Sequence, residues 1–196
     1  KVFATYRQAL PLCIVMAMYF FATSVYPAIW AFWGIARFNW SEITIGWTLS
    51  VFGLITAVVQ GGLTGPAVKW LGERNTTILA LATSVIAAAG YGVATGMSMV
   101  LILFLVHAPE GFAQPALTAL MSKDAPPDAQ GELQGGIASA QNLALLVGTV
   151  MFAQIFGYFL QDGSPIQSPN VAYFISAALG LAALAIFIRL TRSRPA

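Results

Sequence analysis

Long segments without any charged residue divide this sequence, and each one is long enough to cross a lipid bilayer. The charge-free windows are 8–36, 43–68, 75–109, 133–161 and 163–188. A membrane helix needs about 20 mostly apolar residues to span a hydrocarbon core of about 30 Å. The interval between Arg74 and Lys123 is too long for one crossing, and Gly96-Met97-Ser98 marks a turn in its middle. The pattern therefore predicts six transmembrane helices, over residues 10–33, 43–64, 76–95, 99–121, 133–160 and 171–190.

The apolar segments predict helices rather than strands. Their apolar character is continuous, whereas a membrane barrel strand alternates over about ten residues, and an open sheet would leave its edges without hydrogen bonds in lipid. The first segment is too long for the apolar part of a cleavable signal peptide, so we expect it to remain in the protein. The predicted fold class is an all-α integral membrane bundle, with residues 1–196 as one domain.

Composition narrows the functional classes. Of the 196 residues 58% are hydrophobic and only 8% are charged, which excludes an ordinary soluble domain and a disordered chain. A net charge of +2 without a basic cluster predicts no binding of nucleic acid. Cys13 and His107 are the single cysteine and histidine, so we expect no disulfide, no metal site and no cofactor. Motifs for phosphate binding or nucleophilic catalysis are absent from the sequence, so an enzyme is not expected.

The distribution of basic residues predicts the orientation. Eight of the nine Lys and Arg residues fall at the two ends or in the even-numbered connections, and only Arg37 falls on the other side. The positive-inside rule then puts both termini in the cytoplasm. Four tryptophans, Trp30, Trp33, Trp40 and Trp47, flank the connection that holds Arg37, and we expect them to form an aromatic belt at the outer interface, although Trp30 could instead pack between helices.

Small residues and prolines indicate how the helices pack and bend. Gly136, Ala140, Ala144 and Gly148 recur every four residues, which forms a smooth helix face that allows close contact with another helix. Pro27, Pro109 and Pro115 lie inside predicted helices and predict kinks there.

Glu110 is the one carboxylate predicted to lie deep in the bilayer, roughly 16 Å below Met99 at 1.5 Å per residue. His107 and Gln114 lie three and four residues away, and we expect all three on one helix face. A charge at this depth is costly and is usually functional. Two interpretations follow: a proton-coupling or substrate-binding site, or a protonated or His-paired carboxyl group that holds helices together.

Other polar side chains are also predicted at depth. They are Gln60, Gln141, Asn142, Gln154 and Tyr26. Amides can bind a ligand, but they also bridge helices, and bridging is the simpler role for each one taken alone.

Two groups of motifs resemble known transporters. Gly65, Lys69, Gly72, Glu73 and Arg74 resemble, in degenerate form, the loop between the second and third helices of a six-helix half in the major facilitator superfamily. The segment Gln130-Gly131-Glu132-Leu133-Gln134-Gly135, the segment 115–122 and the segment 34–46 look like the carboxyl-terminal half of the tetracycline-resistance family of drug–proton antiporters.

The resemblance implies half of a proton-coupled efflux transporter in a bacterial inner membrane, with small molecules and protons as substrates. It further implies a missing amino-terminal six-helix half, and we expect the isolated chain to pair with itself as a homodimer. The family's histidine and aspartate would fall at Thr56 and Ser84, so neither is present, which places a magnesium–tetracycline substrate in doubt. The alternative function is a non-transporting membrane module or a self-associating scaffold.

Overall fold

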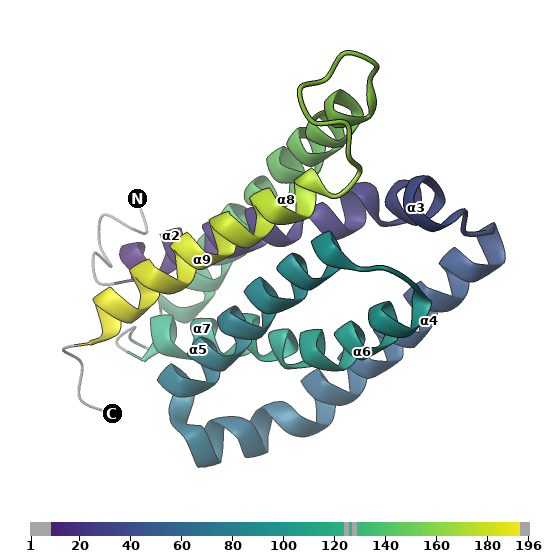
Figure 1. Ribbon diagram of the computed structural model, residues 1–196. Helices are drawn as coiled ribbons and strands as arrows, with labels where there is room; N and C mark the ends of the chain where they lie inside the picture. Colours follow the sequence, from purple (N-terminus) through teal and green to yellow (C-terminus); the bar gives the residue numbers. More distant parts are fainter. Residues whose placement is uncertain (1–8, 124–125, 127–128, 193–196) are drawn as a thin grey trace.

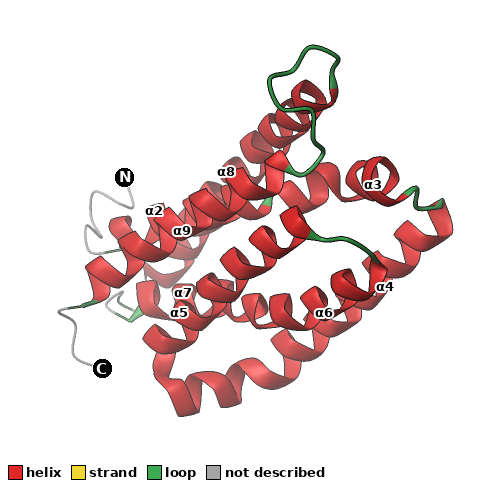
Figure 2. Ribbon diagram, in the orientation of Figure 1, coloured by secondary structure: helices red, strands yellow, loops and turns green. Residues whose placement is uncertain are grey.

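The computed structural model describes residues 9–123, 126 and 129–192, and within these ranges the chain is helical without any strand (Figures 1 and 2). The helices are α2 (Leu10–Thr23), α3 (Val25–Phe38), α4 (Glu42–Val58), the π-helix η1 (Val59–Leu63), α5 (Thr64–Val93), α6 (Met97–His107), the 3₁₀ helix η2 (Ala108–Phe112), α7 (Ala113–Ser122), α8 (Gln130–Leu160) and α9 (Val171–Thr191).

Five continuous helical stretches within the described residues are long and apolar enough to cross a membrane. They are Leu10–Phe38, Glu42–Val93, Met97–Ser122, Gln130–Leu160 and Val171–Thr191. The predicted class, an all-α integral membrane protein, is therefore confirmed. Glu42–Val93 has 52 residues and contains the second and third predicted spans. The ribbon reverses direction within it, between α4 and the later part of α5 (Figure 1).

The turn inside Glu42–Val93 is concentrated at one glycine. Gly72 has φ 75° and ψ 158°, a conformation that is open almost only to glycine. The segment 65–71, predicted as part of a loop, is helical in the structure. Pro66 follows the π-helix η1, so the chain departs from α-helical hydrogen bonding close to a residue that has no N–H to donate.

Two other stretches are interrupted near the prolines that predicted kinks. The break between α2 and α3 falls at Ser24, three residues before Pro27, and the Ser24 hydroxyl donates to the Phe21 carbonyl at 2.6 Å. The stretch from α6 to α7 contains the 3₁₀ turn η2, which includes Pro109. α3 continues beyond the predicted end at Trp33 and stops at Asn39, whose φ is 53°.

Buried apolar side chains form two cores, one above the other along the helices. The first is built on α2, α7 and the beginning of α8, around residues such as Met16, Leu117 and Leu133. The second is built on α3, α6 and the end of α5, around residues such as Trp33 and Tyr91. Ser24 lies between Tyr19 of the first core and Val25 of the second, and η2 begins where the chain passes from Phe104 of the second core to Ala108 of the first. We call this level the seam.

The tryptophan belt predicted for the outer interface is largely wrong. Trp30, Trp33 and Trp40 are buried, and only Trp47 of the four is exposed. The Trp33 indole N–H donates to Asn170 Oδ1 at 2.8 Å, and that of Trp30 donates to Thr48 Oγ1 at 3.1 Å. Interhelical side chains thus satisfy donors that the prediction assigned to interfacial water, and the rings form an aromatic core instead.

The small-residue face of α8 packs against α2 at one point of close contact. A Cβ atom added at Gly148 would lie 2.2 Å from Ser24 Oγ and 2.9 Å from the Phe21 carbonyl oxygen. Ala140 packs against the first core, and Ala144 lines a shallow apolar hollow between α2, α8 and α9. Gly136 is half-buried on the same helix.

Candidate functional site

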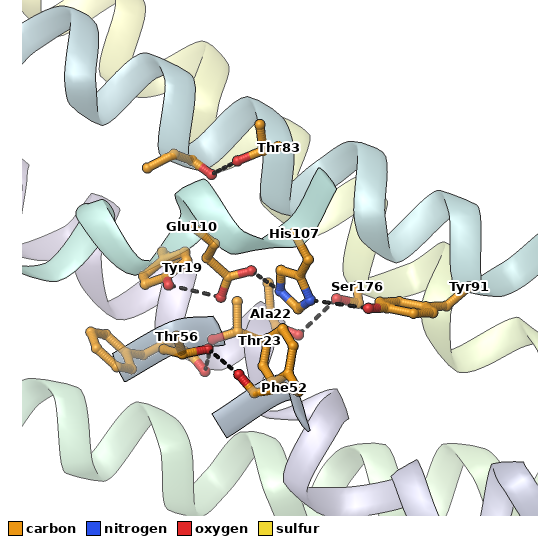
Figure 3. Close-up of polar contacts among 12 residues, drawn as sticks. Tyr19, Ala22, Thr23, Phe52, Thr56, Thr83, Tyr91, His107, Glu110 and Ser176 are labelled. Carbon is orange, nitrogen blue, oxygen red and sulfur yellow. Dashed lines mark hydrogen bonds and ion pairs between the residues drawn. The ribbon is translucent and has the colours of Figure 1, made fainter. Parts of the chain in front are cut away.

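A chain of four polar side chains crosses the seam. Tyr19 Oη donates to Glu110 Oε1 at 2.8 Å, and Glu110 Oε2 contacts His107 Nε2. The other ring nitrogen of His107, Nδ1, lies 3.3 Å from Tyr91 Oη. Figure 3 shows the four side chains in a row, drawn from α2, η2, α6 and α5. His107 is buried and the Glu110 side chain is only 13% exposed, so this polar chain is largely enclosed.

The 3₁₀ turn explains why His107 and Glu110 meet. A 3₁₀ helix has three residues per turn, so side chains at i and i+3 are eclipsed rather than offset. Pro109, between the two, has no N–H and fits this tighter turn. Gln114, which we expected on the same face, follows after η2 and is exposed at a separate cleft. The predicted trio is therefore a pair plus an amide that lines another cleft.

Ser84 of α5 lies beside the pair. It is buried, and its side chain is within hydrogen-bonding reach of the Glu110 carboxyl group. This is the position at which the resemblance placed the family's missing aspartate.

An apolar cavity of about 190 Å³ lies directly beside His107. Its wall contains the rings of Tyr26, Trp30, Phe52, Tyr91, Phe104 and His107, together with Pro27, Thr48 and Leu49. The Tyr26 and Phe52 rings lie 4.6 and 4.8 Å from the His107 ring, centroid to centroid. We refer to this space as the aromatic cavity. Tyr26, a predicted site residue, thus contacts His107, one of the four polar side chains that cross the seam.

A second, larger cleft of about 660 Å³ is lined mainly by polar side chains. Its residues are Gln60, Gln114, Pro115, Thr118, Ala119, Ser122, Gln130 and Gln134. It joins two predicted site residues, Gln60 and Gln114. The other three amides lie elsewhere: Gln141 is buried and its Nε2 contacts Met16 Sδ at 2.7 Å, while Asn142 and Gln154 are exposed on α8. Gln141 therefore bridges α8 and α2.

The loop motif around Gly72 ties helix ends together. Glu73 forms an ion pair with Lys123 at 2.8 Å, and Arg74 Nε donates to the carbonyl and the hydroxyl oxygen of Thr191, both at 3.1 Å. These contacts link the part of α5 that begins after Gly72 to the ends of α7 and α9. Gly65 and Lys69, the other members of the motif, are exposed.

Sequence reasoning missed Tyr19 and Tyr91. Both are buried tyrosines, and a buried phenolic hydroxyl usually has a hydrogen-bond partner. That rule could have marked them as candidate partners of the single deep carboxylate, but which tyrosines reach it depends on how the helices pack. Among the described residues, no group of three or more His, Cys, Asp and Glu side chains is arranged to hold a metal ion.

Comparison with known proteins settles the family. The model of the Major Facilitator Superfamily matches residues 7–196, nearly the whole chain. The chain belongs to the major facilitator superfamily. Membership places it among transporters and not enzymes, as the lack of a catalytic motif predicted.

The chain is similar to several tetracycline-resistance proteins. It is 32% identical to the class C protein of Escherichia coli over 80% of the chain, and 34% identical to the class G protein of Vibrio anguillarum over 66%. It is 28% identical to the class D protein of Salmonella ordonez over 94%. The matches span 38%, 33% and 46% of those relatives, so the chain covers less than half of each. No solved structure matches the chain significantly.

Proposed function

We propose that the chain is the carboxyl-terminal six-helix half of a proton-coupled exporter of small amphipathic compounds. The observation that carries this proposal is the enclosed Glu110–His107 pair beside the aromatic cavity. A carboxylate and an imidazole in contact can share and pass on a proton. An apolar space on the same histidine offers a site for a substrate. A proton carrier adjacent to a substrate site is the arrangement that coupling requires.

The proposed topology has six crossings with both termini in the cytoplasm of a bacterial cell, in its inner membrane. It treats Glu42–Val93 as two spans that turn at Gly72. An even number of crossings returns the chain to the side on which it starts, which suits a half that joins a partner half through a cytoplasmic linker. The similarity to tetracycline-resistance proteins, of which the chain covers less than half, supports a second half.

The surfaces of α4 and α8 are the proposed contact with the missing half. In the most apolar 18-residue segment of Glu42–Val93, and in that of Gln130–Leu160, only 17% of the residues are buried. The corresponding share is 56% for Leu10–Phe38 and for Met97–Ser122. The exposed face of α8 also carries Asn142 and Gln154, which are costly to leave facing lipid. A partner that covers these helices would remove that cost.

Transport by the full-length protein in proteoliposomes tests the proposal directly. With an imposed pH gradient, we expect accumulation of an amphipathic substrate that collapses when a protonophore is added. Protein-free liposomes provide the background. Transport that proceeds equally well without a gradient would contradict proton coupling, and a parent gene without six further spans would contradict the half-transporter proposal.

Without its partner half, the isolated chain is expected to pair with itself through α8. In a Cys13→Ala background, Leu146→Cys should give a disulfide-linked dimer on oxidation, because Leu146 is 65% exposed on this face. The matched control is Leu181→Cys on α9, which is 55% exposed but lies on another helix and should give little dimer. In the full-length protein the Leu146→Cys cross-link should disappear. A monomeric mass in mild detergent, after bound detergent is subtracted, would argue against pairing.

A further inference from the structure

The wall of the aromatic cavity offers rings and almost no accessible hydrogen-bonding atoms. The indole N–H of Trp30 is already donated to Thr48, and the Thr48 hydroxyl is donated to the Ile45 carbonyl at 2.8 Å. Tyr91 Oη is engaged with His107. The Tyr26 hydroxyl has no hydrogen-bond partner among the described residues, but its oxygen is buried and is not accessible from the cavity. A ligand group in this cavity therefore cannot rely on hydrogen bonds to the wall.

A neutral apolar group would gain little from entering such a cavity. Lipid tails are as apolar as the side chains of a membrane protein, so the hydrophobic effect does not favour the cavity over the surrounding bilayer. Aromatic rings differ from lipid in one respect, because their faces carry a negative electrostatic potential that attracts cations. A cation in the cavity would therefore gain an electrostatic attraction to the rings that a hydrocarbon group would not.

The size of the cavity and its lack of accessible hydrogen-bond acceptors restrict the kind of cation. A primary ammonium group has three N–H donors, which would be left unsatisfied here at a considerable cost. A quaternary ammonium group, such as trimethylammonium on a carbon chain, has no N–H donors and spreads its charge over its methyl groups. A cavity of about 150 Å³ accommodates one benzene ring, so about 190 Å³ suffices for a trimethylammonium group of similar bulk.

Charge near the cavity agrees with a cationic ligand. His107 forms part of the wall, and the Glu110 carboxylate lies directly behind its ring. Lys and Arg are absent from the wall. The rim contains Pro27 and Leu49, both exposed, so a ligand group can enter between α3 and α4.

We infer that the aromatic cavity binds a quaternary or fully methylated ammonium group. This inference deepens the proposed function and rests on it, since it names the substrate class for a site that also contains the histidine of the proton-carrying pair. Ligand and proton would then share His107, and a proton bound there would repel the cation by like charge.

Equilibrium binding to the full-length protein in nanodiscs tests the inference with three probes. Choline carries a trimethylammonium group, 3,3-dimethylbutan-1-ol has the same shape without charge, and ethanolamine has the charge with N–H donors. We expect saturable binding of choline, and affinity at least about fivefold lower for each of the other two, from the cation–π contribution. Protein-free nanodiscs give the background. Equal affinity for the neutral alcohol, or for ethanolamine, would overturn the inference.

A pair of matched variants locates the site. Phe52→Leu removes one ring from the wall while keeping an apolar side chain, and should weaken choline binding about fivefold. Phe32→Leu changes an exposed phenylalanine on α3 outside the wall and should leave binding unchanged. Equal affinities of the two variants would refute binding in this cavity. Because binding is measured without a gradient, choline that binds but is not transported would contradict the proposed function alone.

Discussion

Glu110→Gln in the full-length transporter is expected to reduce gradient-driven transport to the level of protein-free liposomes. Glutamine keeps the shape of the side chain and can still accept the hydrogen bond from Tyr19, but it cannot take up or release a proton. The packing around residue 110 would be kept, and the proposed proton carrier would be lost. Transport driven by a pH gradient should therefore disappear while expression and the thermal unfolding midpoint stay near those of the parent.

The control for this prediction is Glu42→Gln. Glu42 is an exposed glutamate at the beginning of α4. It is not one of the four polar side chains that run from Tyr19 to Tyr91. Its substitution should leave transport unchanged. If Glu110→Gln transported at the parental rate with the same pH dependence, Glu110 would be a structural carboxyl group that pairs helices, and the proton path would lie in the other half.

Gly148→Ala is expected to destabilise the protein, although alanine normally favours a helix over glycine by about 1 kcal/mol. The added Cβ would lie 2.9 Å from the Phe21 carbonyl oxygen, a backbone atom that cannot move away without shifting α2. Overpacking of this kind costs about 1–3 kcal/mol. The midpoint of thermal unfolding in detergent should fall by several degrees.

The same substitution at Gly157 of α8 provides the comparison. A Cβ at Gly157 would meet nothing within 4 Å, so Gly157→Ala should leave the midpoint unchanged or raise it slightly. Similar midpoints for the two variants would mean that α8 and α2 do not approach as closely as the structure indicates.

Much of the fold was predictable because the bilayer leaves few options. Charge-free segments of sufficient length must be helices in lipid, and this argument alone predicts the all-α class. The same argument did not predict where each helix ends. The end of α3 depends on Asn39 adopting a left-handed conformation, and the turn within Glu42–Val93 depends on Gly72, whereas charge and polarity mark each connection only to within several residues.

The sequence predicted the charged residue of the site but not the side chains that contact it. Glu110 stands out in the sequence because a deep carboxylate is rare. Its contact with Tyr19, 91 residues away in sequence, depends on how α2 packs against η2. Gln114 was misplaced because a uniform α-helical period was assumed across Pro109, whereas the structure has a 3₁₀ turn there. Trp33 was misplaced because its partner Asn170 belongs to a distant segment.

The seam between the two cores affects how the bundle can bend. An unbroken α-helix resists flexure because each bend strains its ladder of backbone hydrogen bonds, whereas a helix already interrupted by proline or a 3₁₀ turn has fewer such bonds to strain. Here α2–α3 and α6–α7 are both interrupted at the seam, between the two cores. Bending of these two stretches is therefore easiest near the level of Glu110 and His107. In these two stretches, the first and second cores can therefore tilt slightly against each other close to the Glu110–His107 contact.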